Sequence, residues 1–197
     1  SSSSAASDVY KRQGVRFKDK QGRNIHVHGG GAIHHIDQID VSQVDPRVLE
    51  TQIDVAVNWS NILCGPKGVA RVFGPQKGAS PDEVEHLANN LELLAERIKQ
   101  TTGQKVAYKN GSGASGGLGA GLMAFAHATL HPRFDLIQQY LHIEPVIAQA
   151  DLIITAEGCL DYQTPNGKIP AEVARIAEKY DKPVIALAGT IGKQAEF

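Results

Sequence analysis

Apolar residues recur with two different periods along this chain, and each period predicts a different kind of element. Between Val84 and Ile98 apolar side chains return every three to four residues, which is typical of a helix with one buried face. Ser80 followed by Pro81 is typical of a helix start, and Gly103 of a helix end. We therefore predict a core helix that begins at Pro81 and ends before Gly103.

Other apolar runs are short and bounded by turn residues, as strands are. Residues 52–57 alternate in the manner of a strand, and residues 152–155 and 184–187 are apolar runs typical of buried strands. A polar loop over 156–168 and a helix over 170–180 join the last two. This unit predicts an α/β fold, in which ligand sites lie beyond the carboxyl ends of the strands.

A glycine-rich segment, Gly111-Ser-Gly-Ala-Ser-Gly-Gly-Leu-Gly119, lies between a candidate strand at 104–109 and an apolar run at 118–130. The run is apolar nearly all round and predicts a buried helix. Glycines let a backbone present several N–H groups to one anion in front of a helix N-terminus. They also allow a strand and a helix to pack closely without any ligand, so the residues leave both interpretations open.

Neither standard phosphate-binding motif fits this segment. Gly111, Gly113 and Gly116 match the dinucleotide fingerprint as a string, but the second strand that should end in an acid is missing. Residues 131–141 are instead interrupted by proline and then helix-like. A P-loop is excluded because no Gly-Lys-Ser/Thr sequence ends the segment.

Charge and composition exclude several classes of partner. Lys and Arg number 20 and Asp and Glu 21, which gives a net charge of −1 and no long-range attraction to nucleic acid or an anionic membrane. No apolar run is long enough to span a bilayer, and no signal peptide opens the chain. We expect a cytoplasmic protein that acts on a small molecule, with no prediction of its oligomeric state.

The two ends of the chain do not resemble the ends of a domain. Residues 1–13 are Ser-rich without periodicity, and we expect them to be non-native or disordered. The apolar run 184–187 is typical of a buried strand, yet the chain stops at Phe197. Because such a strand seldom closes a domain, we expect the chain to be a fragment.

Four histidines lie close together at His26, His28, His34 and His35 and suggest a metal site. No carboxylate or cysteine stands at ligand spacing within the glycine run between them. We therefore interpret this stretch as a solvated loop.

The predicted loop after residue 155 carries the strongest candidate chemistry. Glu157 and Asp161 are four positions apart, and carboxylates can bind Mg²⁺ or accept a proton from a hydroxyl. Thr164 and Lys168 add a hydroxyl and a cation just before a helix. Together these groups suit phosphoryl transfer, with lysine and backbone N–H groups facing phosphate charge. The alternative is that Asp161 caps a turn and Lys168 is solvated.

Several separated motifs resemble the bacterial glycerate kinase family, which phosphorylates glycerate with ATP. The resemblance spans roughly residues 14–193. It is carried by five segments in the family's order: 73–79, 111–120, 150–158, 160–168 and 183–189.

The resemblance implies a two-domain kinase, with an α+β domain inserted into a Rossmann-like α/β domain and the active site in the cleft between them. Residues 14–147 would be part of the insertion, and residues 148–197 part of the Rossmann-like domain. It also implies ATP and Mg²⁺ as cofactors and D-glycerate as substrate. It favours 2-phosphoglycerate over 3-phosphoglycerate as product, although the residues themselves leave the hydroxyl open.

By this resemblance Glu157, Asp161 and Lys168 are the catalytic residues, and the two carboxylates also bind the metal. Asn61 and Lys77 are assigned to glycerate. The remaining predicted substrate-binding residues are Gly113, Ser115, Gly116, Gly117 and Thr164.

The chain departs from the family pattern at several points. The family's usual opening segments are absent, Asn58 stands in place of a carboxylate, and Cys159 stands in place of an arginine. We therefore expect the isolated chain to be inactive as a kinase. The alternative function is a non-catalytic module that binds a small organic acid or phosphate through the same glycines and cations.

Overall fold

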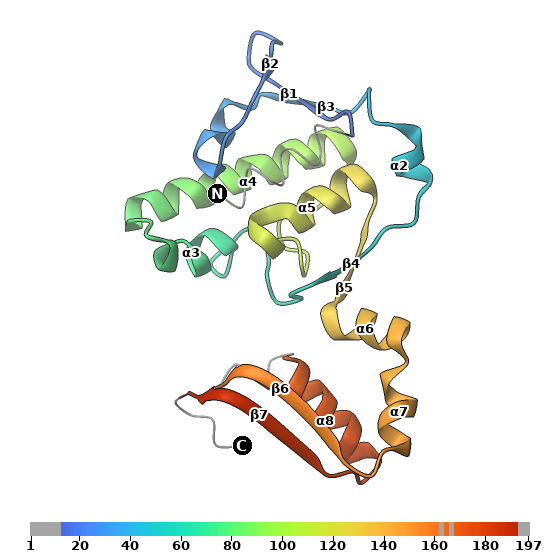
Figure 1. The fold of residues 1–197 in the computed structure, drawn as a ribbon. Helices are drawn as coiled ribbons and strands as arrows, with labels where there is room; N and C mark the ends of the chain where they lie inside the picture. Colours follow the sequence, from blue (N-terminus) through green and yellow to red (C-terminus); the bar gives the residue numbers. More distant parts are fainter. Residues whose placement is uncertain (1–12, 162–163, 166–167, 193–197) are drawn as a thin grey trace. The chain divides into compact units, whose positions relative to one another are not determined.

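The computed structural model describes residues 13–161, 164–165 and 168–192 (Figure 1). The chain divides into two compact units, with the division between Pro132 and Arg133. The predicted disorder of residues 1–13 falls almost entirely outside the described residues.

The first unit opens with a small antiparallel sheet. Strand β1 (Arg16–Lys18) lies in the middle, between β2 (Asn24–Ile25) and β3 (Gln38–Asp40). A short 3₁₀ helix, η1 (Gly30–His35), joins β2 to β3, and α2 (Pro46–Glu50) follows β3.

Helix α4 (Pro81–Thr102) confirms the predicted core helix. The Ser80 hydroxyl accepts a hydrogen bond from the N–H of Glu83 at 3.3 Å, and the Glu83 carboxylate accepts one from the N–H of Ser80 at 2.7 Å. This capping box fixes the first turn, and Gly103 ends the helix in the left-handed region. The helix contacts β3, η1, α3 (Val69–Phe73) and α5 (Ala114–Ala126), and so forms the centre of the unit (Figure 1).

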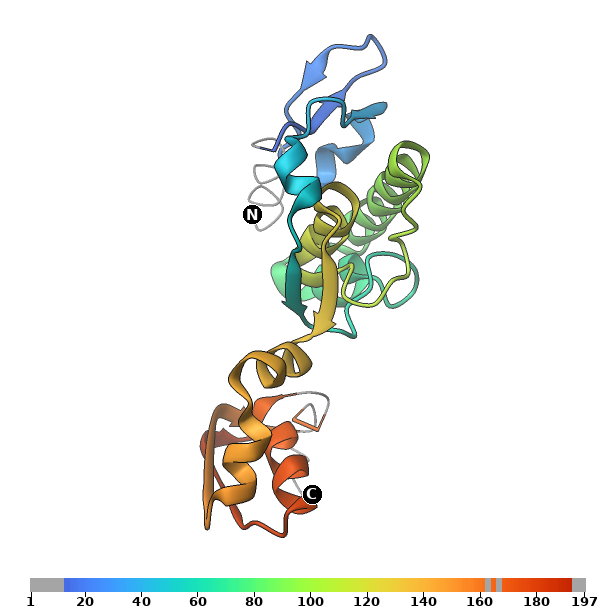
Figure 2. The same ribbon diagram turned by 90° about the vertical axis from the view of Figure 1, so that its right-hand side faces the viewer.

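A two-stranded parallel sheet completes the first unit. Strand β4 (Asp54–Val57) confirms the predicted strand and runs beside β5 (Thr129–Pro132), as Figure 2 shows. Helix α5 (Ala114–Ala126) precedes β5. The prediction of one helix over 118–130 was therefore wrong at its end. His127 takes a left-handed conformation that ends α5, and the N–H of Thr129 then donates to the carbonyl of Ile53, the residue before β4.

Residues 104–109 do not form the predicted strand. Val106 is buried in the core, and the Ala107 carbonyl accepts a hydrogen bond from the N–H of Cys64 at 2.9 Å. A strand requires a series of backbone hydrogen bonds to a neighbouring strand, and this bond is not part of one. The 3₁₀ helix η2 (Pro75–Lys77) lies at the surface between α3 and α4.

The second unit is a β–α–β unit with two preceding helices, α6 (Arg133–Leu141) and α7 (Ile143–Gln149). Strands β6 (Ile153–Leu160) and β7 (Val184–Ile191) are parallel, and α8 (Ile169–Lys179) connects them. The parallel sheets and the helices confirm the predicted α/β class. The predicted loop over 156–168 was wrong in its first part, because pairing with β7 keeps β6 extended as far as Leu160.

The core of the second unit includes residues from α6 and α7. Phe134 and Ile147 pack in the same apolar cluster as Ile153, Val173 and Ala177. The two helices therefore belong to this compact unit. The assignment of residues 14–147 to an inserted domain stays a prediction.

Candidate active site

The predicted site residues fall in both compact units, so each group is described separately. The first unit holds Asn61, Lys77 and the glycine segment. The second unit holds the four residues that carried the predicted phosphoryl-transfer chemistry: Glu157, Asp161, Thr164 and Lys168.

Asp161 and Lys168 form an ion pair at the carboxyl end of β6. The Lys168 ammonium lies 3.2 Å from Oδ1 of Asp161 and donates to the carbonyl of Cys159 at 3.1 Å. Both charged side chains are about three-quarters covered, with exposed fractions of 26% and 24%. The structure therefore brings together an acid and a cation that the sequence placed in one loop.

A local turn holds this pair in place. The N–H of Asp161 donates to the Thr164 hydroxyl at 2.9 Å, and the N–H of Thr164 donates to the Asp161 carbonyl at 2.8 Å. Thr164 is only 3% exposed. Thr164 is thus a buried positioning residue in the structure, whereas its predicted role was to bind substrate.

The start of α8 adds a favourable environment for negative charge. Lys168 is the N-cap residue, Pro170 lies in the first turn, and the carbonyl of Lys168 already accepts from the N–H of Ala171. A helix N-terminus carries partial positive charge. Acid, lysine and helix start therefore meet beyond the end of a parallel strand, where α/β folds place ligand sites.

Glu157 is not part of this turn. It lies within β6 opposite Ala188, and its carboxylate accepts from the N–H of Gly158 at 3.3 Å. Four residues of extended strand correspond to about 13 Å between Cα atoms. The expectation that Glu157 and Asp161 share one polar loop was wrong, because β6 is longer than predicted.

The Asp161 carboxylate offers Mg²⁺ the oxygen ligands that this ion prefers. No group of three or more metal-binding side chains occurs within residues 13–161, 164–165 and 168–192. Mg²⁺ is usually held by one or two carboxylates together with substrate phosphates and water. A single carboxylate at this strand end is therefore a suitable protein ligand for a Mg²⁺ ion that arrives with a nucleotide.

Most backbone N–H groups of the glycine segment are used inside the protein. Gly111 donates to the Trp59 carbonyl at 3.0 Å, and Gly113 donates to the Asn61 carbonyl at 3.1 Å. The N–H groups with backbone acceptors include those of Gly111, Ser112, Gly113, Ala114, Gly116 and Gly117. The structure therefore favours close packing as the reason for the buried glycines.

Steric space supports the same interpretation. A Cβ atom at Gly113 would lie 2.3 Å from the carbonyl oxygen of Ile62, and one at Gly111 would lie 2.5 Å from Cγ2 of Val57. Both distances are too short for any real side chain. These glycines allow the start of α5 to approach the segment that follows β4.

Only the tip of the glycine segment is exposed. Ser115 and Gly116 lie at the surface with φ angles of 51° and 72°, and half-buried Gly117 has a φ of 109°. Left-handed serine is strained, and strain of this kind is often found at functional sites. An anion from solution would meet the segment at this tip.

Asn61 and Lys77 differ in their surroundings. Asn61 is half-buried and linked to the glycine segment through its carbonyl. Lys77 is exposed in η2 and forms no ion pair with any other residue that the structure describes.

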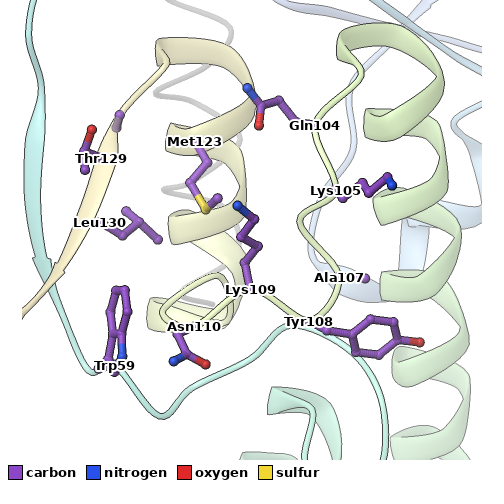
Figure 3. A pocket seen from close by; sticks show the side chains of 11 residues that line it. Trp59, Gln104, Lys105, Ala107, Tyr108, Lys109, Asn110, Met123, Thr129 and Leu130 are labelled. Atoms are coloured by element: carbon purple, nitrogen blue, oxygen red, sulfur yellow. The ribbon is translucent and has the colours of Figure 1, made fainter.

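The sequence reasoning missed a cavity of about 810 Å³ in the first unit (Figure 3). Trp59, Lys105 and Lys109 are among its lining residues. The available signal was two lysines in a short segment without acids, but residues 104–109 were interpreted as a strand.

The glycerate kinase family model matches residues 6–197, and the chain therefore belongs to this family. It is 43% identical to a glycerate kinase of Halalkalibacterium halodurans, over 93% of this chain and 48% of the relative. It is 42% identical to the glycerate 2-kinase of Escherichia coli K12, over 90% of this chain and 46% of the relative.

A solved structure agrees with these relatives. The crystal structure of a protein assigned as glycerate kinase 2 from Salmonella typhimurium LT2 matches with a TM-score of 0.77 and 40% identity. The match covers 94% of this chain and 50% of that chain. The chain thus spans about half the length of the relatives it matches.

Proposed function

We propose that the protein is an ATP-dependent glycerate kinase that transfers the γ-phosphoryl group of ATP to D-glycerate. The observation that carries the proposal is the Asp161–Lys168 pair at the carboxyl end of β6, 3.2 Å apart. The names of its relatives supply the substrate. The Escherichia coli relative is named a glycerate 2-kinase, which supports 2-phosphoglycerate as the product.

The roles proposed for the second unit follow from charge. Phosphoryl transfer depends mainly on positioning and on stabilisation of negative charge. Asp161 is proposed to accept the proton of the glycerate hydroxyl or to bind the metal, and Lys168 to contact phosphate oxygens. A bound Mg²⁺ would neutralise charge on the phosphates.

Glu157 keeps a proposed role separate from that of Asp161. Extended strand geometry keeps it about 13 Å from Asp161 along β6. We therefore propose that Glu157 contacts substrate or metal independently, and that any metal ligand shared with phosphate is Asp161.

The roles proposed for the first unit concern anionic groups. Ser115, Gly116 and Gly117 form the exposed tip of the glycine segment and are proposed to bind substrate oxygens there. Asn61 and Lys77 are proposed to contact glycerate. Gly113 is proposed to act indirectly, by holding the tip against Asn61 through its 3.1 Å hydrogen bond.

A chimaera tests the activity directly. This chain would replace the matching segment of the Escherichia coli relative, and ADP release would be measured with D-glycerate and Mg-ATP. We expect glycerate-dependent ADP release, with phosphate on the 2-hydroxyl of the product. A folded chimaera that binds glycerate without releasing ADP would contradict the proposal.

The alternative is a binding module for a small organic acid or phosphate. One observation favours it: Glu157 and Asp161 lie too far apart along β6 to act as a close acid pair. Glycerate binding without nucleotide binding would support this alternative. The cytoplasmic location, and the expectation that neither nucleic acid nor a membrane is a partner, stay predictions.

A further inference from the structure

The cavity in the first unit is much larger than glycerate requires. Its volume of about 810 Å³ falls in the range that holds drug-sized ligands, roughly 300–1,000 Å³. Glycerate has a three-carbon skeleton and would leave most of this space filled with water. The size of the cavity therefore points to a larger ligand than the proposed phosphoryl acceptor.

All charged side chains that line the cavity are positive. None of its lining residues is acidic, whereas Lys105 and Lys109 both line it. Figure 3 shows the Lys109 side chain extending into the middle of the cavity, while the Lys105 side chain points toward α4. Among the described residues, Lys109 has no carboxylate partner. Its ammonium is therefore available to an anion.

One wall of the cavity is aromatic and apolar. Trp59 follows the end of β4, is 39% exposed, and lies on the same side of the cavity as Leu130 (Figure 3). Met123 from α5 extends the apolar surface. Aromatic rings stack favourably on an indole, and an exposed Trp beside a cavity is a frequent ligand contact.

Amide groups add hydrogen-bonding capacity beside the lysines. Gln104 and Asn110 both line the cavity, and the Gln104 side chain extends toward it in Figure 3. An amide can donate and accept at once, which suits the edge of a heteroaromatic or carboxylated ring. The cavity thus combines a flat apolar wall, two amides and a cation.

We propose that this cavity binds a planar organic anion, with its ring against Trp59 and its negative group on Lys109. Nucleoside phosphates and aromatic carboxylates share this chemistry. The cavity belongs to the first unit, whereas Asp161 and Lys168 belong to the second, and the binding test does not require kinase activity.

Trp59 provides the test, because it is the only tryptophan of the chain. Tryptophan fluorescence would be titrated with AMP and with benzoate, in the absence of magnesium. Glycerate and inorganic phosphate serve as ring-free anions. We expect saturable quenching by AMP, by benzoate or by both, and the responding compound identifies the source of the ligand. The ring-free anions should bind at least tenfold more weakly.

Matched lysine variants test the role of charge. Lys109→Gln should weaken binding about tenfold, the loss expected for one charge-assisted hydrogen bond. Lys109→Arg should retain most of the affinity, and Lys20→Gln, at an exposed lysine outside the cavity, should leave it unchanged. Lys109 is exposed, so these variants should fold as the parent does.

Three results would overturn the proposal. The first is no saturable quenching by either planar anion. The second is equal affinity for the ring-free anions. The third is unchanged affinity in Lys109→Gln.

Discussion

The ammonium of Lys168 lies 3.2 Å from Oδ1 of Asp161, although the two residues are seven positions apart and separated by a turn. The same ammonium donates to the carbonyl of Cys159, the residue before the last one of β6. Lys168 therefore ties the start of α8 to the end of the strand. Replacing Lys168 should therefore change both the position of the α8 start and the charge at the end of β6.

Replacing Lys168 by Met should lower kcat/KM for Mg-ATP by roughly 10²-fold, because one cation that faces phosphate charge is lost. Lys168→Arg should restore part of the activity, since the charge remains. The variants would be assayed in the chimaera with the Escherichia coli relative. Lys182→Met, at a lysine that follows α8, is the control and should leave kcat/KM unchanged. Equal losses of kcat/KM in Lys168→Met and Lys182→Met would contradict the role assigned to Lys168.

Gly113→Ala should destabilise the first unit by about 1–3 kcal/mol, the range expected for overpacking. The added methyl group would lie 2.3 Å from the Ile62 carbonyl oxygen and 2.4 Å from Cγ1 of Val69. Urea unfolding would measure the free energy. Gly31→Ala is the control, because no atom lies within 4 Å of the added Cβ there. A neutral Gly113→Ala would show that the glycine is not required for packing.

Asp54 should make stability depend on pH in the acid range. A hydrogen bond from His131 at 2.7 Å, followed by one from Gln52 at 2.8 Å, holds the pKa of Asp54 below its usual value of 3.8. A lowered folded-state pKa contributes stability above the unfolded-state value, and this contribution is lost as pH falls through the folded-state value. Asp54→Asn should therefore lower the melting temperature at neutral pH.

The difference between Asp54→Asn and the parent should shrink as the pH drops below about 4. Melting curves recorded across the acid range would measure it. Glu50→Gln, at an exposed acid that ends α2 in the same unit, is the control for a general charge effect. A difference that stays constant across the range would contradict the assignment to Asp54.

One face of the β6–β7 sheet is apolar and exposed among the described residues. Ile154 is 63% exposed and Leu187 is 56% exposed, whereas Ile153 on the opposite face is only 9% exposed. We expect this chain to bind a hydrophobic dye, and Ile154→Lys with Leu187→Lys to reduce that binding while the melting temperature is kept. Ile153→Lys should instead unfold the second unit, because it buries a charge. Unchanged dye binding in the double variant would contradict this account.

Local signals in the sequence predicted the elements that depend on neighbouring residues. Ser80 and Gly103 marked both ends of α4 because capping acts within a few positions. The end of β6 could not be predicted in this way, since its last residues remain extended only through pairing with β7. Leu130 was assigned to a helix because an apolar run alone does not distinguish a buried helix from a buried strand.

The sequence predicted part of the candidate site and missed the rest. Asp161 and Lys168 were found because both follow a buried strand and precede a helix. The burial of Thr164 depends on a turn that the sequence does not specify. The Lys109 cavity was missed because its walls come from segments far apart in the chain, from Trp59 to Leu130.

The most direct test of the central claim is the rate of glycerate-dependent ADP release by the chimaera with and without the Asp161 carboxylate. Asp161→Asn should lower kcat by roughly 10²- to 10⁴-fold, as expected for loss of a proton acceptor or metal ligand. Asp151→Asn, at an exposed acid just before β6, should retain the parent rate. If a folded Asp161→Asn chimaera releases ADP at the parent rate, Asp161 does not take part in phosphoryl transfer.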